Sequence, residues 1–171
     1  MEKGNKAMKD VLLETNKISK HFASTVAVNE VSLVVRPGEI RGLIGENGSG
    51  KSTLSSMVAG ILQPNGGSML FNGAPFAPKT ALEAQDAGVG MIVQEAGTVS
   101  GISIAENIFL GRDAEFSKLF FVNRRAMVAK ANEALRKIGV VNIDAGEPIE
   151  SLDMQDRKLV EVAKVMWDNP R

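Results

Sequence analysis

The first half of the chain carries short apolar runs that predict β-strands. The run 11–18 and the valine-rich run 26–35 predict two strands, and 68–71 predicts a third. Two further runs, 40–44 and 89–93, are largely apolar, which is typical of strands buried on both faces. The pattern therefore predicts a sheet in the first half, part of it deeply buried.

Helical spacing of apolar residues dominates the second half. Helices are expected at 53–62 and 80–87 and then, beyond residue 103, at 104–110, 123–138 and 155–167. In 123–138 one face carries Met127, Ala131, Ala134, Leu135 and Ile138, and in the last helix Leu159, Val162, Ala163 and Met166 form an apolar stripe. No convincing strand follows residue 104. We expect a flexible tail at 1–10, an α/β core at 11–103 and a helical subdomain at 104–171.

Composition narrows the functional classes. The 171 residues hold 20 basic and 20 acidic side chains, so no overall charge indicates a nucleic acid partner. The chain has no cysteine, which excludes disulfides and thiolate metal sites, and its single His21 is interpreted as a surface loop residue. No apolar run approaches the roughly 20 residues of a membrane span. These features indicate a cytoplasmic, soluble chain.

The most informative segment is 45–52, which matches the phosphate-loop pattern GxxxxGK[ST] in full. It stands between a predicted strand and a predicted helix, as the motif requires. Its glycines would allow backbone N–H groups to turn toward a phosphate at the positive end of the helix. Lys51 would contact the terminal phosphates and the Ser52 hydroxyl would bind magnesium. The predicted nucleotide-binding residues here are Gly45, Glu46, Asn47, Gly48, Ser49, Gly50, Lys51, Ser52 and Thr53.

Together with the segments around this motif, the chain resembles the ATP-binding subunits of ABC transporters, and more narrowly those of bacterial monosaccharide importers of the ribose, galactose and xylose type. The resemblance rests on the segments 16–22, 31–40, 63–67, 104–112 and 160–164, in this order and spacing around the phosphate loop. It implies a P-loop NTPase core of ABC type with an antiparallel β element and a helical subdomain.

The resemblance also assigns roles to single residues. Phe22 matches the aromatic residue that stacks on adenine, and the alternative is a core aromatic residue between two strands. Gln94 matches the glutamine that reaches magnesium and the attacking water, which makes it a candidate catalytic and metal-binding residue beside Lys51 and Ser52. The implied cofactors are ATP and Mg²⁺.

Two departures from the family pattern stand near the end of the chain. The signature segment, usually Leu-Ser-Gly-Gly-Gln, aligns with Leu152–Asp156, so Asp153, Met154 and Gln155 form a degenerate version that would face ATP in the opposite domain. Asp153 would also serve as a helix N-cap. In addition, the family's Walker B aspartate, catalytic glutamate and switch histidine lie beyond the point matched by Arg171. We therefore expect a domain truncated before the Walker B strand.

The resemblance implies an ATP hydrolase that powers sugar import, peripheral on the cytoplasmic face of the membrane. Its partners would be a second nucleotide-binding domain, transmembrane permease subunits and, indirectly, a sugar-binding protein. The fragment by itself is expected to be inactive. Two alternatives remain open, namely a truncated or degenerate module that binds nucleotide without turnover, and a small-molecule kinase or GTPase on the same loop. Autoinducer or nucleoside cargo is also compatible with similar ATPases.

Overall fold

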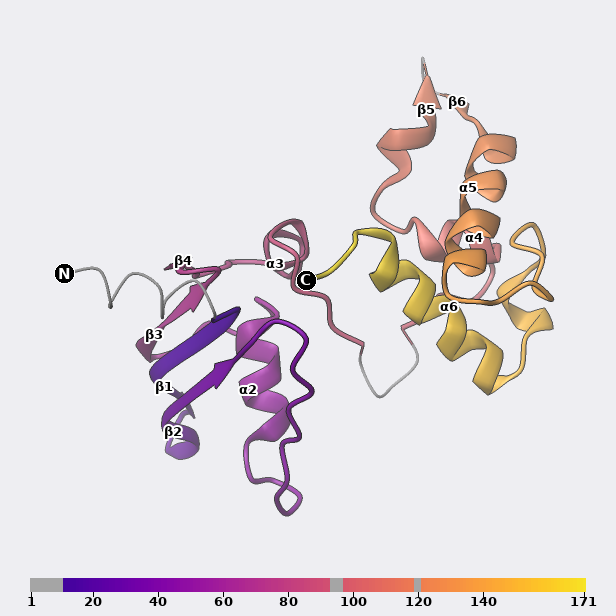
Figure 1. The fold of residues 1–171 in the computed structure, drawn as a ribbon. Helices are drawn as coiled ribbons and strands as arrows, with labels where there is room; N and C mark the ends of the chain where they lie inside the picture. Colours follow the sequence, from indigo (N-terminus) through magenta and orange to yellow (C-terminus); the bar gives the residue numbers. More distant parts are fainter. Residues whose placement is uncertain (1–10, 93–96, 119–120) are drawn as a thin grey trace. The chain divides into compact units, whose positions relative to one another are not determined.

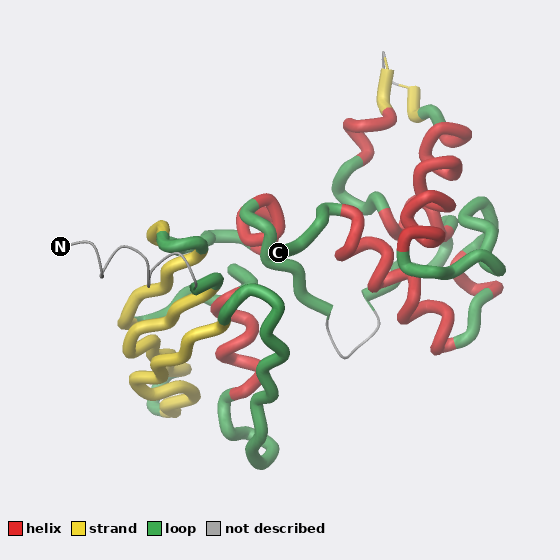
Figure 2. The backbone as a smooth tube through the Cα atoms, viewed as in Figure 1, coloured by secondary structure: helices red, strands yellow, loops and turns green. Residues whose placement is uncertain are grey.

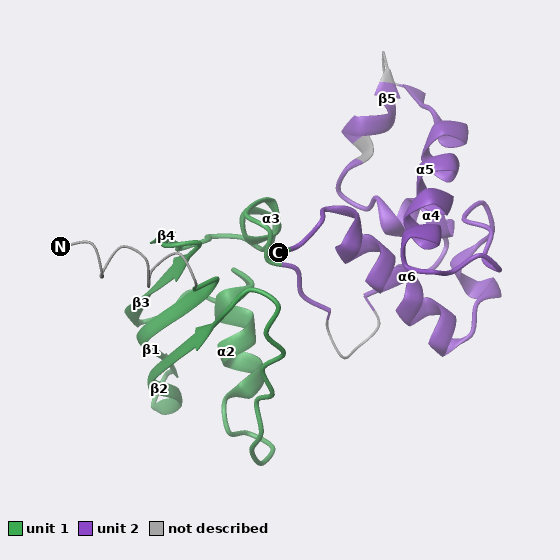
Figure 3. Cartoon of the chain, in the orientation of Figure 1, with its two compact units in different colours: residues 1–89, 171 green, residues 90–170 purple. Residues whose placement is uncertain are grey.

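The computed structural model describes residues 11–92, 97–118 and 121–171, shown by chain position in Figure 1 and by secondary structure in Figure 2. The expected tail at 1–10, Gln94 and the end of the expected strand at 89–93 therefore lie outside the described residues. The chain forms two compact units, Met1–Val89 with Arg171 and Gly90–Pro170 (Figure 3).

The first unit is built on a four-stranded antiparallel sheet of order β2-β1-β3-β4. The strands are β1 (Leu13–Phe22), β2 (Thr25–Val35), β3 (Gly66–Phe71) and β4 (Ala74–Pro75). The turn between β3 and β4 has positive φ at Asn72 and Gly73, 52° and 75°, which is the combination that suits tight hairpins. The three strands predicted at 11–18, 26–35 and 68–71 are confirmed.

Register shifts interrupt the pairing of β1 with β2, and side-chain hydroxyls bond backbone groups there. Thr15, which is buried, donates to the Val31 carbonyl at 3.2 Å and accepts from the Leu33 amide at 3.0 Å. The Ser19 hydroxyl accepts from the Glu30 amide at 2.9 Å. These bonds satisfy backbone groups near the bulges, which lets the long hairpin twist without unpaired polar groups.

Helices α2 (Lys51–Val58) and α3 (Ala81–Asp86) complete the first unit. The prediction that the first helix extends to residue 62 is wrong. Gly60, with φ of 71°, and Ile61 close the helix, because their amides donate to the Met57 carbonyl at 3.2 Å and the Ser56 carbonyl at 2.9 Å. The core packs the sheet against both helices through Ile18, Val28, Leu54, Met57, Met69, Phe71, Phe76 and Ala84.

The buried strands predicted at 40–44 and 89–93 are not formed at the described positions. Figure 2 shows the chain between β2 and α2 as loop, and 89–92 is also without strand pairing. Ile40 is 100% exposed and Ile44 is 99% exposed. A parallel strand needs a neighbour on which to place its backbone hydrogen bonds. The described four-stranded sheet ends at β2 and β4, and neither segment pairs with it.

The second unit is helical, with α4 (Ile104–Ile108), α5 (Arg124–Lys137) and α6 (Met154–Trp167) packed on one another. Short elements join them: the 3-10 helices η2 (Asp113–Phe116) and η3 (Ile149–Ser151) and the hairpin of β5 (Ser117–Lys118) with β6 (Phe121–Val122). The hairpin corrects the expectation of no strand after residue 104. Each of its strands has two residues, too few to show a period of two in the sequence.

The core of the second unit confirms one predicted helix face and corrects the other. On α5, Met127, Ala131, Ala134 and Leu135 are buried and Ile138 packs against them, as predicted. On α6 the buried residues are Val160, Glu161 and Ala163, whereas Met166 of the predicted stripe is exposed. The buried face of α6 is thus turned from the expected stripe, and it contains a carboxylate.

Candidate nucleotide site

The phosphate loop lies at the surface of the first unit, between the 36–44 loop and α2. Its residues 45–49 are exposed, and the Ser49 amide closes a turn on the Glu46 carbonyl at 3.2 Å. Gly48 and Gly50 have φ of 84° and 86°, a backbone conformation that residues with a side chain rarely adopt. A Cβ at Gly50 would also lie 2.2 Å from the Ala27 carbonyl oxygen, so the loop packs backbone to backbone on β2.

The Lys51 side chain lies inside this loop and donates hydrogen bonds to it. Its Nζ donates to the carbonyl oxygens of Gly45 and Glu46, both at 2.7 Å, and to the Ser49 hydroxyl at 3.2 Å. The ammonium therefore lies at the centre of the loop, where the motif predicts contact with phosphate. The structure brings together the loop residues that the sequence singled out.

The first turn of α2 suits an anion. The N-cap of α2 is Gly50, no side chain caps the helix, and its first turn holds no acidic residue. The amides at a helix N-terminus have no intrahelical partner, and the helix dipole favours negative charge there. Ser52, in this turn, is exposed and Thr53 is half-buried. The capless turn and the close approach at Gly50 fit a bound phosphate group.

A cavity of about 290 Å³ is lined by residues of both the loop and β2. From the predicted site it is lined by Gly45, Ser49, Gly50 and Lys51, and from the sheet by residues such as Ala27, Val28 and Asn29. The phosphate loop thus faces β2 close to the point where the β1–β2 hairpin turns.

Phe22 ends β1 and pairs with Thr25 at this turn. Its side chain is 46% exposed, so it is not a core aromatic between two strands. The Nζ of Lys20 lies 5.4 Å from the centre of the Phe22 ring. Lys20 pairs with Val28, a residue that lines the loop cavity, and Phe22 follows two positions later. The register therefore places the ring along the same hairpin as the wall of the cavity.

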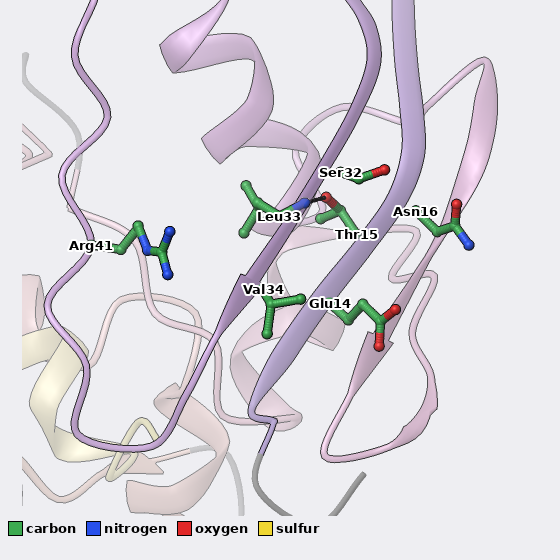
Figure 4. Close-up of a pocket in the computed structure, with 7 residues that line it drawn as sticks. All are labelled: Glu14, Thr15, Asn16, Ser32, Leu33, Val34 and Arg41. Carbon is green, nitrogen blue, oxygen red and sulfur yellow. Dashed lines mark hydrogen bonds between the residues drawn. The ribbon is translucent and has the colours of Figure 1, made fainter. Parts of the chain in front are cut away.

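A second cavity, of about 500 Å³, lies over the β1–β2 pair (Figure 4). Arg41 faces this cavity, but its guanidinium is paired with the carboxylate of Glu39. Hydrogen bonds from the Arg36 amide and from Arg41 lower the pKa of Glu39. No residue of the phosphate loop lines the cavity, and we do not place the nucleotide there.

Gln94 itself is outside the described residues, and side chains of the second unit bond the backbone of residues 97–101. The Gly97 amide donates to Oε1 of Glu161 at 2.8 Å, and the Gly101 amide donates to Glu150 at 2.6 Å. Between them, Asn107 accepts from the Val99 amide at 2.6 Å and donates to its carbonyl at 3.0 Å. Sequence reasoning missed these three side chains, although a glutamate inside the apolar run of α6 was a usable signal.

The signature-like segment lies at the start of α6. Asp153 is the N-cap, and its Oδ1 accepts from the amides of Gln155 at 2.9 Å and Asp156 at 2.8 Å. Asp153, Met154 and Gln155 are all exposed. Asp153 therefore acts as a helix cap, as the sequence suggested.

Among the described residues no group of three or more His, Cys, Asp or Glu side chains is arranged to hold a metal ion. No helix in the described part of the chain is long and apolar enough to cross a membrane.

Comparison with known proteins decides the family. The sequence pattern described as "ABC transporter" matches residues 28–171. The chain belongs to the ABC transporter family. This ABC chain is 40% identical over 158 residues to a putative ribose/galactose/methyl galactoside import ATP-binding protein of Pseudomonas savastanoi pv. phaseolicola, covering 92% of the chain and 30% of the relative. It is 38% identical over 160 residues to a ribose import ATP-binding protein of Corynebacterium glutamicum, covering 94% and 30%. The ABC chain thus spans about 30% of the length of these relatives.

Solved structures confirm the ABC fold. An ATP-binding cassette of an ABC transporter superposes with a TM-score of 0.74 at 26% identity, over 94% of this chain and 66% of the cassette. A dimeric bacterial ABC transporter cassette reaches a TM-score of 0.74 at 18% identity, over 93% and 71%. The expected fold class, an ABC-type α/β core with an antiparallel sheet and a helical part, is therefore confirmed.

Proposed function

We propose that this chain provides an ATP site of an ABC-type sugar import ATPase. The observation that carries the proposal is the loop at 45–52, in which Lys51 lies at the centre and the first turn of α2 has no cap and no acidic side chain. Relatives named as ribose and galactose import ATP-binding proteins support the sugar import system. One solved relative is described in its ADP conformation, which supports an adenine nucleotide.

Each residue of the proposed nucleotide site has its own role. Backbone amides of the loop and of the first turn of α2 bind the phosphates, and Lys51 supplies a point charge for the β- and γ-phosphates. Ser52 and Gln94 would hold magnesium, which would supply positive charge to the transferred phosphoryl group. Gln94 also orients the attacking water, because an amide both accepts and donates hydrogen bonds. Phe22 stacks on the adenine ring.

The assembly we propose has two nucleotide-binding domains face to face and transmembrane permease subunits, with a sugar-binding protein acting indirectly. Asp153, Met154 and Gln155 would face the ATP of the opposite domain. A dimeric cassette among the structural relatives supports the fold of such a domain pair. The location would be the cytoplasmic face of the membrane, where the permease subunits offer their contacts.

Lys51→Ala tests the nucleotide site. Both proteins are titrated with a fluorescent ATP analogue in magnesium, and Lys17→Ala, which removes an exposed lysine of the same unit, is the control. A charge-assisted hydrogen bond contributes about 1.5 kcal/mol or more, so Lys51→Ala should weaken binding about tenfold or more. Equal affinities for the starting protein and Lys51→Ala would refute the phosphate-loop assignment.

Binding without turnover is the second candidate function. It is favoured by the 40–44 segment, which precedes the phosphate loop without strand pairing and with Ile40 and Ile44 exposed. Catalysis needs the reacting groups held in place, and the segment that leads into the loop has no strand partner in the described sheet. We expect the 171 residues to bind ATP but to release no phosphate above background, measured against Lys51→Ala. Turnover that Lys51→Ala removes would exclude this candidate.

A further inference from the structure

Lys20 lies on β1 beside the ring of Phe22, and its ammonium is held there. Its Nζ donates to the carbonyl oxygen of Gln63 at 2.6 Å and lies over the Phe22 ring, 5.4 Å from the ring centre. Lys20 is half-buried, and it takes part in no ion pair among the described residues. A surface lysine ordinarily extends its ammonium into water and keeps much of its rotamer freedom. The ordering of this side chain therefore has an entropic cost that no carboxylate offsets.

The segment between α2 and β3 fixes the backbone on both sides of this lysine. The Asn65 amide donates to the Ser19 carbonyl at 2.8 Å, and Oδ1 of Asn65 accepts from the His21 amide at 2.9 Å. The acceptor of the ammonium is fixed as well, because the side-chain amide of Gln63 donates to the Pro78 carbonyl at 2.7 Å. Hydrogen bonds thus hold both the backbone of the lysine and the carbonyl group that its ammonium contacts.

The ring of Phe22 is set only in part by its backbone. Phe22 precedes a tight turn, in which Ala23 has φ of 51°, and it pairs with Thr25 across that turn. Its side chain is 46% exposed and is not part of the described core of the first unit. The turn fixes the Cα atom, whereas the side-chain torsions take one rotamer only if a contact selects it. The ammonium of Lys20 supplies such a contact on one face of the ring.

A cation on one face of an aromatic ring also changes what the opposite face attracts. Ring faces carry negative potential, so two rings placed directly face to face repel each other. An ammonium is attracted to this potential and draws the π electrons toward itself, which leaves the opposite face less negative and better suited to a purine ring. A ring that is already oriented also loses less entropy when a base binds. The ammonium over Phe22 therefore favours stacking in two ways.

We infer that Lys20 is a positioning residue of the nucleotide site, whose ammonium holds the Phe22 ring by one face and leaves the opposite face for a purine base. The inference rests on the proposed function in one respect, namely that the ring receives the base of a nucleotide. Two other roles of Lys20 give different experimental results. One is a structural link between β1 and residues 63–65, and the other is a direct charge interaction with the phosphates.

The first experiment needs no nucleotide. The three-bond couplings of Phe22 Cγ to its own backbone nitrogen and carbonyl carbon, measured by NMR in the full chain, show whether the side chain keeps one χ1 rotamer. Lys20→Gln removes the charge but keeps a hydrogen-bond donor, whereas Lys20→Arg keeps a cation, which also binds to ring faces. Lys17→Gln is the matched control, because it removes the charge of an exposed lysine on the same strand.

The starting protein, Lys20→Arg and Lys17→Gln should each show one χ1 rotamer of Phe22, and Lys20→Gln should show couplings averaged over several rotamers. Averaged couplings in the starting protein, or a single rotamer in Lys20→Gln, would overturn the inference. Averaging in Lys17→Gln as well would also overturn it, because the loss of any charge on the strand would then be sufficient.

The second experiment compares ATP with inorganic triphosphate, which has no base. Lys20→Gln should weaken ATP binding about two- to fivefold, the factor that corresponds to an exposed cation–π contact. Lys20→Arg should restore most of this affinity, and neither variant should change the binding of triphosphate. In a Phe22→Ala background, Lys20→Gln should not weaken ATP binding further, because the lysine acts through the ring.

Three results of the second experiment would contradict the positioning role. Unchanged ATP affinity in Lys20→Gln would show that the ring needs no cation. An equal loss for ATP and triphosphate would assign Lys20 to the phosphates or to the structure of the unit, and a loss that persists without the Phe22 ring would exclude action through the ring. If Lys51→Ala binds ATP like the starting protein, the proposed function fails, and the χ1 couplings of Phe22 still decide whether Lys20 positions the ring.

Discussion

A Cβ at Gly50 would lie 2.2 Å from the carbonyl oxygen of Ala27 and 3.2 Å from a methyl carbon of Val28. This relationship fixes the phosphate loop to strand β2. The obstruction on the Ala27 side is backbone, which cannot rotate away as a side chain would. Gly50 thus meets two conditions at once, a positive φ of 86° and the close approach of a strand.

Gly50→Ala should therefore destabilise the first unit more than Gly48→Ala does. Gly48 has a similar φ of 84° but nothing within 4 Å of its added Cβ. Gly48→Ala should cost about 1 kcal/mol for the left-handed backbone alone. Gly50→Ala carries the same cost plus displacement of the loop from β2. Urea unfolding measures both variants, and equal losses would show that the loop yields without cost at Ala27.

Phe22→Ala should weaken ATP and ADP binding by about 1 to 3 kcal/mol, the range for base stacking on an aromatic ring. Inorganic triphosphate has no base, so its affinity should not change. Phe121, which is 81% exposed in the second unit, offers the control Phe121→Ala. A loss shared by triphosphate would contradict a base-specific role of Phe22. The measurement is competition with a fluorescent ATP analogue.

Asp153→Ala should lower the free energy of unfolding of the second unit by about 1 kcal/mol, because α6 loses its N-cap. Asp153→Ser and Asp153→Asn should retain stability, since both side chains cap helices. Thermal unfolding of the three variants checks this. A stable Asp153→Ala would mean that the bonds to Gln155 and Asp156 contribute little.

The same variants test the proposed face-to-face assembly. A carboxylate about 4 Å from a phosphate charge meets a repulsion of about 4 kcal/mol at an effective dielectric constant of 20. Asp153→Ser should then strengthen ATP-driven closure of the two domains, and Asp153→Asn should recover part of the effect. ATP affinity and ATPase rate in the assembled transporter are the measurements. If the starting protein, Asp153→Ser and Asp153→Asn have the same ATP affinity and ATPase rate, Asp153 is only a helix cap.

Acid should destabilise the second unit through Glu106. Hydrogen bonds from the Ser103 amide and then from its hydroxyl lower the pKa of Glu106 below its ordinary value of 4.5. Because the folded pKa is the lower one, the stabilisation is fully present above pH 4.5 and is lost as pH falls through the depressed pKa. Urea unfolding between about pH 7 and about pH 3 should show this loss. Glu106→Gln should reduce the loss of unfolding free energy at low pH, whereas Glu133→Gln should leave that loss unchanged.

Local sequence patterns predicted the elements that depend on local chemistry. The Asp153 cap and the buried face of α5 both follow from propensities and spacing within one element. The segments 40–44 and 89–92 follow a different rule. Their apolar residues indicate buried strands, but a strand exists only where another strand accepts its hydrogen bonds. The sequence of the segment itself does not show whether a neighbouring strand is present to pair with it.

The candidate site was predictable to a similar degree. The loop at 45–52 was found complete, because a phosphate-binding backbone requires particular residue types at fixed spacing. Glu161 was missed, since a carboxylate on a helix is ordinarily a solvated one. Its contact with Gly97 spans 64 positions and depends on how α6 lies in its unit.

The three hydrogen bonds of Lys51 have a thermodynamic consequence. A phosphate that reaches the ammonium replaces carbonyl oxygens that already accept from it, so binding exchanges contacts instead of adding them. The enthalpy assigned to this lysine by calorimetry should accordingly be smaller than that of a lysine recruited from water. The same bonds hold the loop in shape beforehand, which reduces the ordering entropy that the ligand must overcome. One ammonium group thus shapes the loop, and in the proposed site the same group would supply charge to the bound phosphate.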